Sequence, residues 1–232
     1  MYIYTATSSP GGRTGTLSQS GSGSITVTGL TNETAYTFTV TATNAIGTSV
    51  GSNVSNSVLR GPQEVGDFYG GGVIFYQFVA GDAGYVAGQS HGLIAAIVDQ
   101  SSGIRWNNGS NVTTGATGTA EGTGGTNTGA IIAAQGATET SYAAGLARAY
   151  TGGGYTDWFL PSINELNKMY ENRSTINTTA SANSGSNFTT NYYWSSTEKD
   201  TNNVWLRNFS NGVLFNISKD DTRPNVRAVR AF

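Results

Sequence analysis

Residues 193–232 read YWSSTEKDTNNVWLRNFSNGVLFNISKDDTRPNVRAVRAF, and this stretch decides how the chain is understood. Its two ends have the pattern of regular structure. Between them, apolar, charged and asparagine residues alternate without a steady hydrophobic period. A fixed framework around irregular chemistry is typical of a binding surface, because a rigid scaffold tolerates change in the segments that it displays. It is not the pattern of a catalytic constellation.

A β-hairpin is predicted inside this stretch. The turn sequence Ser-Asn-Gly at 210–212 separates a run at 205–209 from a second run at 213–215. Asn-Gly between two such runs is a strong short-range hairpin signal. Because successive side chains of a strand point to opposite faces, only one of Leu214 and Phe215 is expected to face solvent, unless both complete the core.

The composition favours a loop-rich β protein and excludes several classes of function. The 232 residues suffice for one large or two small domains, and they include 32 glycines and only 4 prolines. Charged residues make up 11% with a net charge of -2, so no basic excess is present to neutralise nucleic-acid phosphates. The chain has no cysteine, which rules out disulfides, thiolate metal sites and thiol nucleophiles within it.

Nothing in the sequence predicts membrane insertion. No run approaches 18 consecutive apolar residues, and the first residues lack the basic and apolar regions of a signal peptide. The expected partners therefore do not include nucleic acid, and no membrane insertion is expected.

Residues 1–60 form the first predicted unit, and its clearest element is a strand at 36–44. Apolar residues at even positions alternate there with threonines at odd positions, which is the pattern of a half-buried strand. Residues 25–28 alternate in the same way, and glycine-rich turns bracket the region.

This unit resembles the second half of a bacterial fibronectin type III domain over residues 2–58. The matching residues are Leu30, Thr34, Tyr36, Phe38, Val40, Ala42, Asn44 and Gly47. The resemblance implies an Ig-like β-sandwich in which Tyr36 forms the tyrosine corner. Its first two strands have no counterpart before Tyr2, so a truncated sandwich is expected. Either the chain is a fragment, or another element or subunit covers the open side, because an uncovered edge favours association, including homo-oligomers.

Residues 61–66 are predicted to be a linker, and residues 67–232 the second unit. Its expected elements are two buried strands, a long loop and a helical region, at 72–79, 92–98, 107–129 and 130–150. A further helix begins after Ser162, which forms a capping box with Glu165. The apolar face of that helix consists of Ile163, Leu166, Met169 and Tyr170.

The whole second unit resembles the C-type-lectin-like domains of the formylglycine-generating-enzyme type found in bacterial and phage surface proteins. The matching motifs are GDFYGGGVIFY at 66–76, HGLIAA at 91–96, GYTDWFLP at 154–161, YWSS at 193–196 and VRAVR at 226–230. The expected fold class is therefore mainly β with an α+β C-terminal domain, in which a truncated Ig-like β-sandwich is followed by a C-type lectin fold.

The final stretch resembles the variable region of proteins that retroelements diversify. In those systems an error-prone reverse transcriptase rewrites adenines of a copied template, so asparagine codons become codons for many residue types. The matching frame is WSSTE at 194–198 and RAVRAF at 227–232. The resemblance implies ligand contacts at exposed variable positions, namely Lys199, Asp200, Asn203, Leu206, Arg207, Ser210, Val213, Leu214, Phe215, Ile217, Ser218, Asp220, Asp221 and Arg223.

The expected function is ligand recognition by an extracellular protein on a bacterial cell or a phage virion. Its expected ligand is a protein or glycan on another cell's surface. One alternative is a fixed adhesin that reads polysaccharide without diversification, and another is a purely structural surface or tail module.

No enzymatic activity is expected. Residues 88–92 match the Gly-x-Ser-x-Gly nucleophile elbow, but a strand is expected to follow them, and the chain's sole histidine lies inside the motif. Asp157 and Glu165 are nearby carboxylates, yet the capping box already explains Glu165. The oxidation chemistry of the enzyme that names the lectin type needs cysteine.

These patterns require no cofactor. Many C-type lectins bind calcium, and Asn107, Asn108 and Asn111 carry the oxygen atoms that this ion prefers. The chain has no Asp-x-Asp-x-Asn run and no Glu-Pro-Asn triplet. A structural calcium ion is therefore the one metal considered, and sugar coordination through it is not expected.

The tryptophans divide into two groups. Trp106, Trp158 and Trp194 lie in framework segments and are expected in the core. Trp205 lies in the variable strand and is expected to point inward, which leaves the apolar residues and the arginine of 206–215 as exposed contacts. Large apolar side chains beside an arginine are typical of interface anchors.

Overall fold

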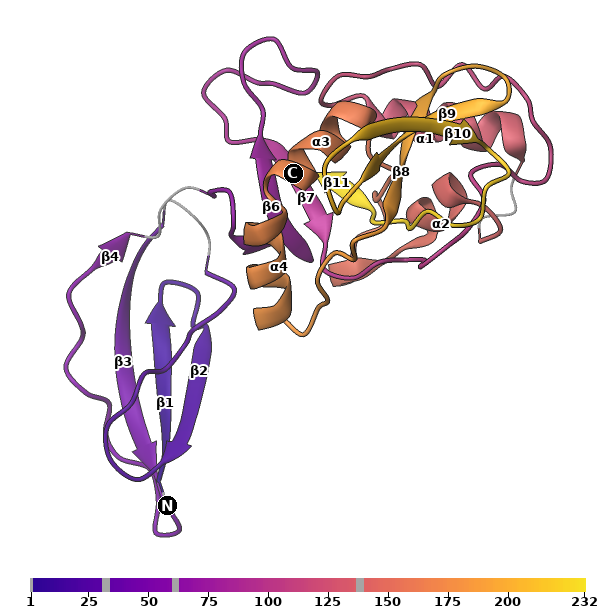
Figure 1. The fold of residues 1–232 in the computed structure, drawn as a ribbon. Helices are drawn as coiled ribbons and strands as arrows, with labels where there is room; N and C mark the ends of the chain where they lie inside the picture. Colours follow the sequence, from indigo (N-terminus) through magenta and orange to yellow (C-terminus); the bar gives the residue numbers. More distant parts are fainter. Residues whose placement is uncertain (1, 31–33, 60–62, 137–139) are drawn as a thin grey trace. The chain divides into compact units, whose positions relative to one another are not determined.

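The computed structural model describes residues 2–30, 34–59, 63–136 and 140–232 (Figure 1). Two compact units divide the chain between Gln63 and Glu64. Within the described residues the strands form three antiparallel sheets, and four short α-helices belong to the second unit. The prediction of a mainly β fold with an α+β C-terminal part is confirmed.

The first unit is built on one antiparallel sheet in the order β2-β1-β3-β4. Its strands are β1 (Tyr2–Ser9), β2 (Thr14–Gln19), β3 (Ala35–Thr43) and β4 (Val58–Leu59). The strand predicted at 36–44 is β3, and Tyr36 near its start is buried. Threonines of three strands share one face of this sheet, since Thr5 lies opposite both Thr16 and Thr41.

Residues 25–28 alternate like a strand but do not form one. The carbonyl of Thr26 lies over Gly15 of β2, where an added Cβ atom would come within 2.1 Å of the oxygen. The missing side chain of Gly15 permits this approach. An alternating pattern therefore marks extended chain that packs on a sheet as well as chain within one.

Serine hydroxyls complete the hydrogen bonding along one edge of β3. Ser49, Ser52 and Ser55 each donate their main-chain N–H to a β3 carbonyl and accept a β3 N–H at Oγ, over 2.8–3.0 Å. Each hydroxyl takes the place that a carbonyl has in a regular ladder. This edge is therefore satisfied although residues 49–55 have no strand assignment.

Two sheets form the β structure of the second unit, in the orders β11-β7-β6-β5 and β10-β9-β8. Their strands are β5 (Phe68–Tyr69), β6 (Gly72–Gln77), β7 (Gly92–Ala96), β8 (Tyr192–Glu198), β9 (Asn203–Asn208), β10 (Leu214–Ser218) and β11 (Val229–Ala231). The strands predicted at 72–79 and 92–98 are β6 and β7. The predicted hairpin is formed by β9 and β10.

The helices are α1 (Gly124–Gln135), α2 (Ala143–Ala149), α3 (Ile163–Glu171) and α4 (Arg173–Ala182), with a 3-10 turn at Gly152–Gly154. The prediction of a loop through residue 129 is wrong, because α1 begins at Gly124. The Asn127 side chain exchanges hydrogen bonds of 2.6 and 3.0 Å with the main chain of Gly118. These tertiary contacts override the low helix propensity of the segment.

The helical region predicted at 130–150 is divided between α1 and α2, with residues 137–139 outside the described part. The sequence pattern did not predict α4, in which Ile176 and Ala180 are buried. Among the described residues, no helix has the length and apolar character needed to cross a membrane.

The helix predicted after Ser162 is α3, and its capping box is confirmed. Ser162 Oγ accepts the N–H of Glu165 at 3.2 Å, while the Glu165 carboxylate accepts the N–H of Ser162 at 2.8 Å. The apolar face is buried at three positions and half-buried at a fourth, namely Ile163, Leu166 and Met169, then Tyr170.

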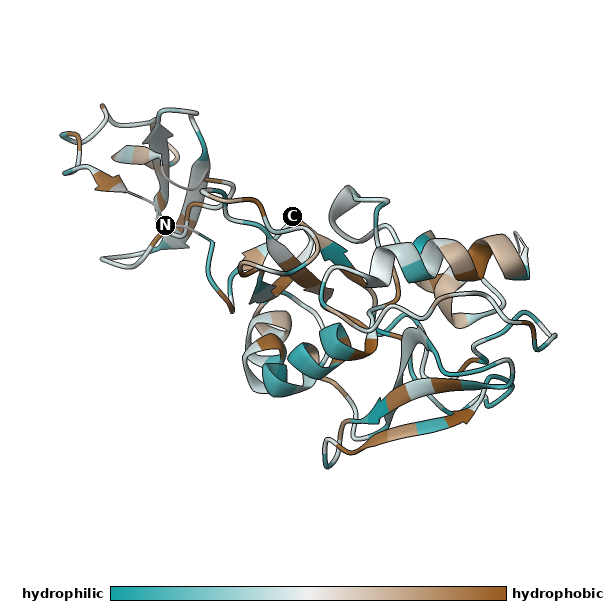
Figure 2. Ribbon diagram, turned by 90° about the horizontal axis from the view of Figure 1, so that it is seen from above, coloured by the Kyte–Doolittle hydropathy of each residue, from teal (hydrophilic) through white to brown (hydrophobic). Residues whose placement is uncertain are grey.

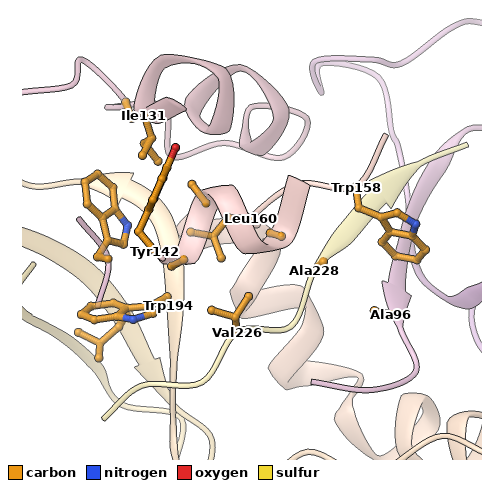
Figure 3. Packing of buried hydrophobic residues seen from close by; sticks show 14 of the residues in the cluster. Ala96, Ile131, Tyr142, Trp158, Leu160, Trp194, Val226 and Ala228 are labelled. Atoms are coloured by element: carbon orange, nitrogen blue, oxygen red, sulfur yellow. The ribbon is translucent and has the colours of Figure 1, made fainter. Parts of the chain in front are cut away.

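Three tryptophans anchor the larger core, which Figure 3 shows around Leu160 and Val226. Trp106, Trp158 and Trp194 are at most 1% exposed, so their predicted place in the framework is confirmed. Each indole N–H donates to a main-chain carbonyl, over 2.8, 3.1 and 2.7 Å respectively. A buried indole needs such an acceptor, and these bonds therefore fix the orientation of each ring.

Candidate ligand-binding face

The hairpin of β9 and β10 lies at one edge of its sheet and carries both apolar and polar residues (Figure 2). Its register pairs Leu206 with Phe215 and Val204 with Ile217, and cross-strand partners share a face. This side is called the inner face. The other side, called the open face, consists of Asn203, Trp205, Arg207, Leu214, Asn216 and Ser218.

The prediction that Leu206 is exposed is wrong. Leu206 and Val204 are fully buried on the inner face, where Trp194 of β8 lies opposite Leu206. Trp205, which was expected to point inward, lies between them on the other side of the strand and is half-buried. Trp205 packs there against the core cluster that contains Met169 and Phe209, so the expectation for Leu206 alone is wrong. Both sides of β9 contact core residues, which a simple alternation of inward and outward positions does not predict.

Leu214 and Phe215 are both exposed, at 44% and 38%. Alternation puts them on opposite faces, yet both reach solvent because β10 is an edge strand of the described sheet. The ring of Phe215 packs edge-on against Tyr192, with 5.7 Å between the ring centres. The expectation that only one of the two faces solvent is therefore wrong.

Most of the predicted contact residues reach solvent. The exposed members are Lys199, Asp200, Ser210, Val213, Leu214, Phe215, Ser218, Asp220 and Arg223. The half-buried members are Asn203, Arg207, Ile217 and Asp221. They form a chemically mixed surface on the hairpin and on the segment that follows it.

Two cations lie at the open face. Lys199 donates from Nζ to Asn216 Oδ1 at 2.8 Å, and Nζ is 5.4 Å from the centre of the Trp205 ring. Arg207 donates from Nη1 to the carbonyl of Gly212 at 2.6 Å. Within the described part of the chain, neither cation has a carboxylate within the 4.0 Å of an ion pair. Neither cation is therefore in a direct ion pair, although the charges of Glu171 and Asp200 act on Arg207 and Lys199 respectively over longer distances.

Tyr170 of α3 forms a wall beside Arg207. Its ring centre is 5.6 Å from Cζ of Arg207 and 4.0 Å from Cζ of Arg173. Gly212 has a φ of 75° and packs on the same ring, where an added Cβ would come within 2.5 Å. Burial lowers the pKa of Arg207, whose Nε is buried without a partner among the described residues. A framework helix thus positions an arginine of the variable stretch.

Local contacts shape the segments at both ends of the hairpin. Asp200 Oδ1 accepts the main-chain N–H groups of Asn203 and Asn202 at 2.8 and 2.9 Å, which forms an Asx turn. Hydrogen bonds from Asn203 and Asn202 lower the pKa of Asp200. Arg223 pairs with Asp221 at 2.5 Å, and its hydrogen bonds lower the pKa of Asp221.

A buried ion pair joins the two ends of the hairpin segment. Lys219, fully buried directly after β10, donates to the carboxylate of Glu198 and, at 2.8 Å, to the carbonyl of Val112. Glu198 also accepts the N–H groups of Thr114 and Gly115, at 2.9 and 3.0 Å. Sequence reasoning missed this pair, because Lys219 lies in a polar run that carries no signal of burial.

A second buried ion pair holds the chain after the variable stretch. Arg227 is 1% exposed, and its Nε is 2.5 Å from Asp99 Oδ1. Its terminal nitrogens donate to the carbonyls of Ala96 and Ser186 at 3.1 and 3.3 Å. Asp99 also accepts from the Tyr193 hydroxyl at 2.8 Å, and burial raises the pKa of Tyr193 to about 12. The variable stretch therefore begins and ends at buried charges.

A small cavity opens at the end of the inner face. Its volume is about 70 Å³, and its walls are formed by Tyr192, Phe215, Ile217, Arg223 and Pro224. Three of these residues belong to the predicted variable set and two belong to the framework. The cavity therefore combines fixed and changeable walls.

The family model described as the Lcl C-terminal domain matches residues 95–230. The chain belongs to this family. The match covers more than half of the 232 residues and includes both buried ion pairs and the whole hairpin. The Lcl C-terminal domain has a C-type-lectin-like fold and is associated with diversity-generating retroelements and variable ligand-binding proteins. A comparison with curated proteins finds no match to this chain.

The pairing of Asp157 with Arg230 forms another part of the frame of the Lcl C-terminal domain. The guanidinium of Arg230 contacts both carboxylate oxygens, at 2.7 and 2.8 Å, and Cζ lies 3.8 Å from the Tyr155 ring centre. Hydrogen bonding to Arg230 lowers the pKa of Asp157. These residues therefore tie the 154–161 motif to the last strand.

The histidine and the buried carboxylate that were weighed as catalytic candidates are both engaged in structural contacts. His91 lies just before the Lcl C-terminal domain, and Glu165 lies within it. His91 Nδ1 is 2.9 Å from the carbonyl of Phe232, and Nε2 is 2.8 Å from Gln89 Oε1. Strand β7 follows the 88–92 motif. The buried carboxylate of Glu165 accepts main-chain N–H groups from three residues, and burial raises its pKa to about 7.

The asparagines considered as calcium ligands form a hydrogen-bond network. Asn107 Nδ2 donates to Asn111 Oδ1 at 2.6 Å and to Asp220 Oδ1 at 2.7 Å, and Asn111 Nδ2 donates to Asp220 Oδ2 at 3.1 Å. Amide N–H groups rather than oxygens thus face the carboxylate. The described residues include no cluster of three His, Cys, Asp or Glu side chains suited to a metal ion.

Proposed function

We propose that the second unit is the ligand-binding domain of a surface protein. The exposed residues of 199–223 recognise a protein or glycan on the surface of another cell. One observation carries this proposal, which is that buried ion pairs hold both ends of the segment while most side chains between them reach solvent. A mixed apolar and cationic surface on a rigid frame supports selective binding.

Diversification by a retroelement is part of the proposal. Substitutions at exposed positions usually change stability by no more than about 0.5 kcal/mol, so the surface can change its ligand without refolding the domain. The alternative is a fixed adhesin that binds one polysaccharide. The two differ in whether the exposed positions vary between alleles.

The proposed location is extracellular, on a bacterial cell or a phage virion. In this proposal the first unit is an attachment module of the fibronectin type III kind, and the second is of the formylglycine-generating-enzyme type. We assign no catalytic role and no cofactor, because His91, Asp157 and Glu165 are held in structural contacts. Neither nucleic-acid binding nor membrane insertion is part of the proposal.

Deep sequencing of the locus in its source population tests the proposal. Changes should cluster at exposed positions such as Lys199, Leu214 and Arg223, beside an invariant template copy and a reverse-transcriptase gene. The buried residues Leu206 and Lys219 should stay fixed or change only to residues that fit the core. An invariant tail without a template copy would point to the fixed adhesin instead.

Binding is tested separately on arrays of surface glycans and surface proteins. The full chain is compared with a variant in which Leu214 and Phe215 are both replaced by serine. Loss of a signal in the variant, with an unchanged unfolding transition, supports recognition by this face. A structural module would give no specific signal with either protein.

A further inference from the structure

We propose that β10 is an open sheet edge that receives an extended segment of a partner protein as an added strand. This inference rests on the proposed function and specifies its ligand as polypeptide. Strand addition supplies affinity through main-chain hydrogen bonds, while side-chain pockets supply specificity.

The hydrogen-bond register of the hairpin shows which groups are open. Asn208 N–H donates to the carbonyl of Val213 at 3.0 Å, and Lys219 N–H donates to the carbonyl of Asn202 at 2.9 Å. In an antiparallel pair, hydrogen-bonded residues alternate with residues whose N–H and C=O point away from the partner strand. The main-chain N–H and C=O groups of Leu214 and Asn216 therefore point away from β9.

These outward groups have no acceptor or donor within the described chain. The main-chain N–H and C=O of Leu214 and Asn216 form no hydrogen bond with any described residue, and β9 is the sole described neighbour of β10. Ser218 adds an outward N–H, while its carbonyl accepts from Asp221 at 3.1 Å. The edge thus offers the spaced donors and acceptors that an incoming strand pairs with.

The composition of β10 does not protect this edge. Proteins usually blunt an exposed edge with lysine, proline or an inward-pointing charge. Residues 214–218 read LFNIS, which contains neither charge nor proline, and Leu214 and Phe215 are exposed. An unprotected apolar edge within the proposed binding face is suited to a specific strand partner.

The cavity beside Phe215 and Ile217 supplies the side-chain pocket for such a strand. Both residues are on the inner face of β10, so alternate side chains of an added strand point to the same side. Its volume of about 70 Å³ and its walls of Tyr192 and Pro224 suit one aliphatic or small aromatic group. The occupant is therefore an extended segment with an apolar residue at this register.

The opposite side of the added strand lies toward the open face. Lys199 and Arg207 lie there, and neither forms an ion pair with a described carboxylate. The side chains of the added strand that point toward this face must then complement positive charge. Acidic residues are therefore expected at the positions that alternate with the apolar one. The segment that fits is extended, apolar on one side and acidic on the other.

Strand addition would also give this surface a constant component of affinity. Main-chain groups of β10 stay in place whichever side chains the variable positions carry. Diversification then changes selectivity through the pocket and the open face, while the ladder of hydrogen bonds persists.

A panning experiment with a displayed library of linear peptides, each about 12 residues long, tests the inference on the full chain. Enriched peptides should carry an apolar residue alternating with acidic ones. A synthetic copy of the best peptide is then titrated against the wild type, Asn216→Pro and Asn216→Ala. Proline removes an outward N–H without removing a bond to β9, whereas alanine removes only the side chain.

The expected result is affinity weakened about tenfold or more by Asn216→Pro, with Asn216→Ala close to the wild type. In wild-type protein the peptide should also slow hydrogen exchange at the amides of Leu214 and Asn216, a readout that does not depend on how the proline variant folds. Equal binding by both variants without such protection overturns the strand inference, although peptide binding elsewhere on the face would keep the proposed function.

Two other outcomes also overturn the inference. Failure of every linear peptide to enrich, while glycans or folded proteins bind, leaves the proposed function standing without an added strand. A concentration-dependent dimer that Asn216→Pro abolishes, seen by light scattering, would identify the occupant of the edge as a second copy of this chain.

Discussion

Lys199 and Lys219 are the same residue type in one short stretch, yet their environments in the fold are opposite. Lys219 is fully buried and paired with the Glu198 carboxylate, while Lys199 is exposed and hydrogen-bonds an amide. The buried lysine holds the hairpin to the frame, and the exposed one contributes charge to the surface. The difference shows that position in the fold, rather than residue type, decides which residues are open to change.

The largest effect is expected from Lys219→Met. Removing the ammonium leaves the Glu198 carboxylate buried without its partner, which costs about 3–5 kcal/mol of unfolding free energy. The matched variant Lys199→Met should stay within about 0.5 kcal/mol of the wild type. Urea unfolding followed by tryptophan fluorescence measures both.

Replacing Glu198 by leucine together with Lys219→Met serves as the control. This double variant removes both charges and should recover part of the lost stability, because no unpaired ion is left inside. Equal losses in Lys199→Met and Lys219→Met would contradict the division between frame and surface.

A slightly smaller difference in unfolding free energy is expected between the variants Leu206→Ala and Leu214→Ala. Leu206 is fully buried beside Trp194, so its truncation should cost about 3 kcal/mol through lost burial and a cavity. Leu214 is 44% exposed and should change stability by less than about 1 kcal/mol. Thermal unfolding of both variants checks the assigned faces of β9 and β10, and the reverse order would invert them.

The stability of the folded domain is also expected to depend on pH. Burial raises the pKa of Glu165 from 4.5 to about 7, so the folded state holds this proton more tightly than the unfolded state. The contribution of this proton to the free energy of unfolding is on the order of 2–3 kcal/mol. It is fully present below pH 4.5 and is lost as the pH rises through about 7. Urea unfolding at pH 5 and pH 8 measures this slope, which Glu165→Gln should flatten.

The smallest effects on stability are expected at the exposed hairpin residues. Replacing Val213 or Ser210 by alanine should shift the unfolding free energy by no more than about 0.5 kcal/mol, because neither side chain is buried. Binding to a ligand selected on the array should change far more than stability. Losses above about 2 kcal/mol would show that the surface is part of the frame.

Part of this architecture could be predicted from local pattern. The capping box of Ser162 and Glu165, the hairpin signal at 210–212 and the alternation along β3 all rest on contacts between near neighbours in sequence. Such features depend on backbone geometry and short-range hydrogen bonds. They are therefore encoded within a few residues.

The start of α1 could not be predicted in this way. Its first turn is rich in glycine and threonine, and it is held by the contact of Asn127 with Gly118 and by Thr128 Oγ1, which accepts the N–H of Leu160 at 3.0 Å. Gly118 lies in the preceding loop and Leu160 is 32 residues from Thr128, so the propensities of the helix residues themselves do not contain the information.

The sequence by itself determined that this chain has two β-rich units, three core tryptophans and a variable-looking stretch framed by regular motifs. Only the tertiary structure decided that Leu206 faces the core, that Lys219 is buried on Glu198 and that β10 has an open edge. Periodicity gives the spacing of side chains along a strand but not which side the core lies on. That choice is made by distant segments that remove one face from water and leave the other exposed.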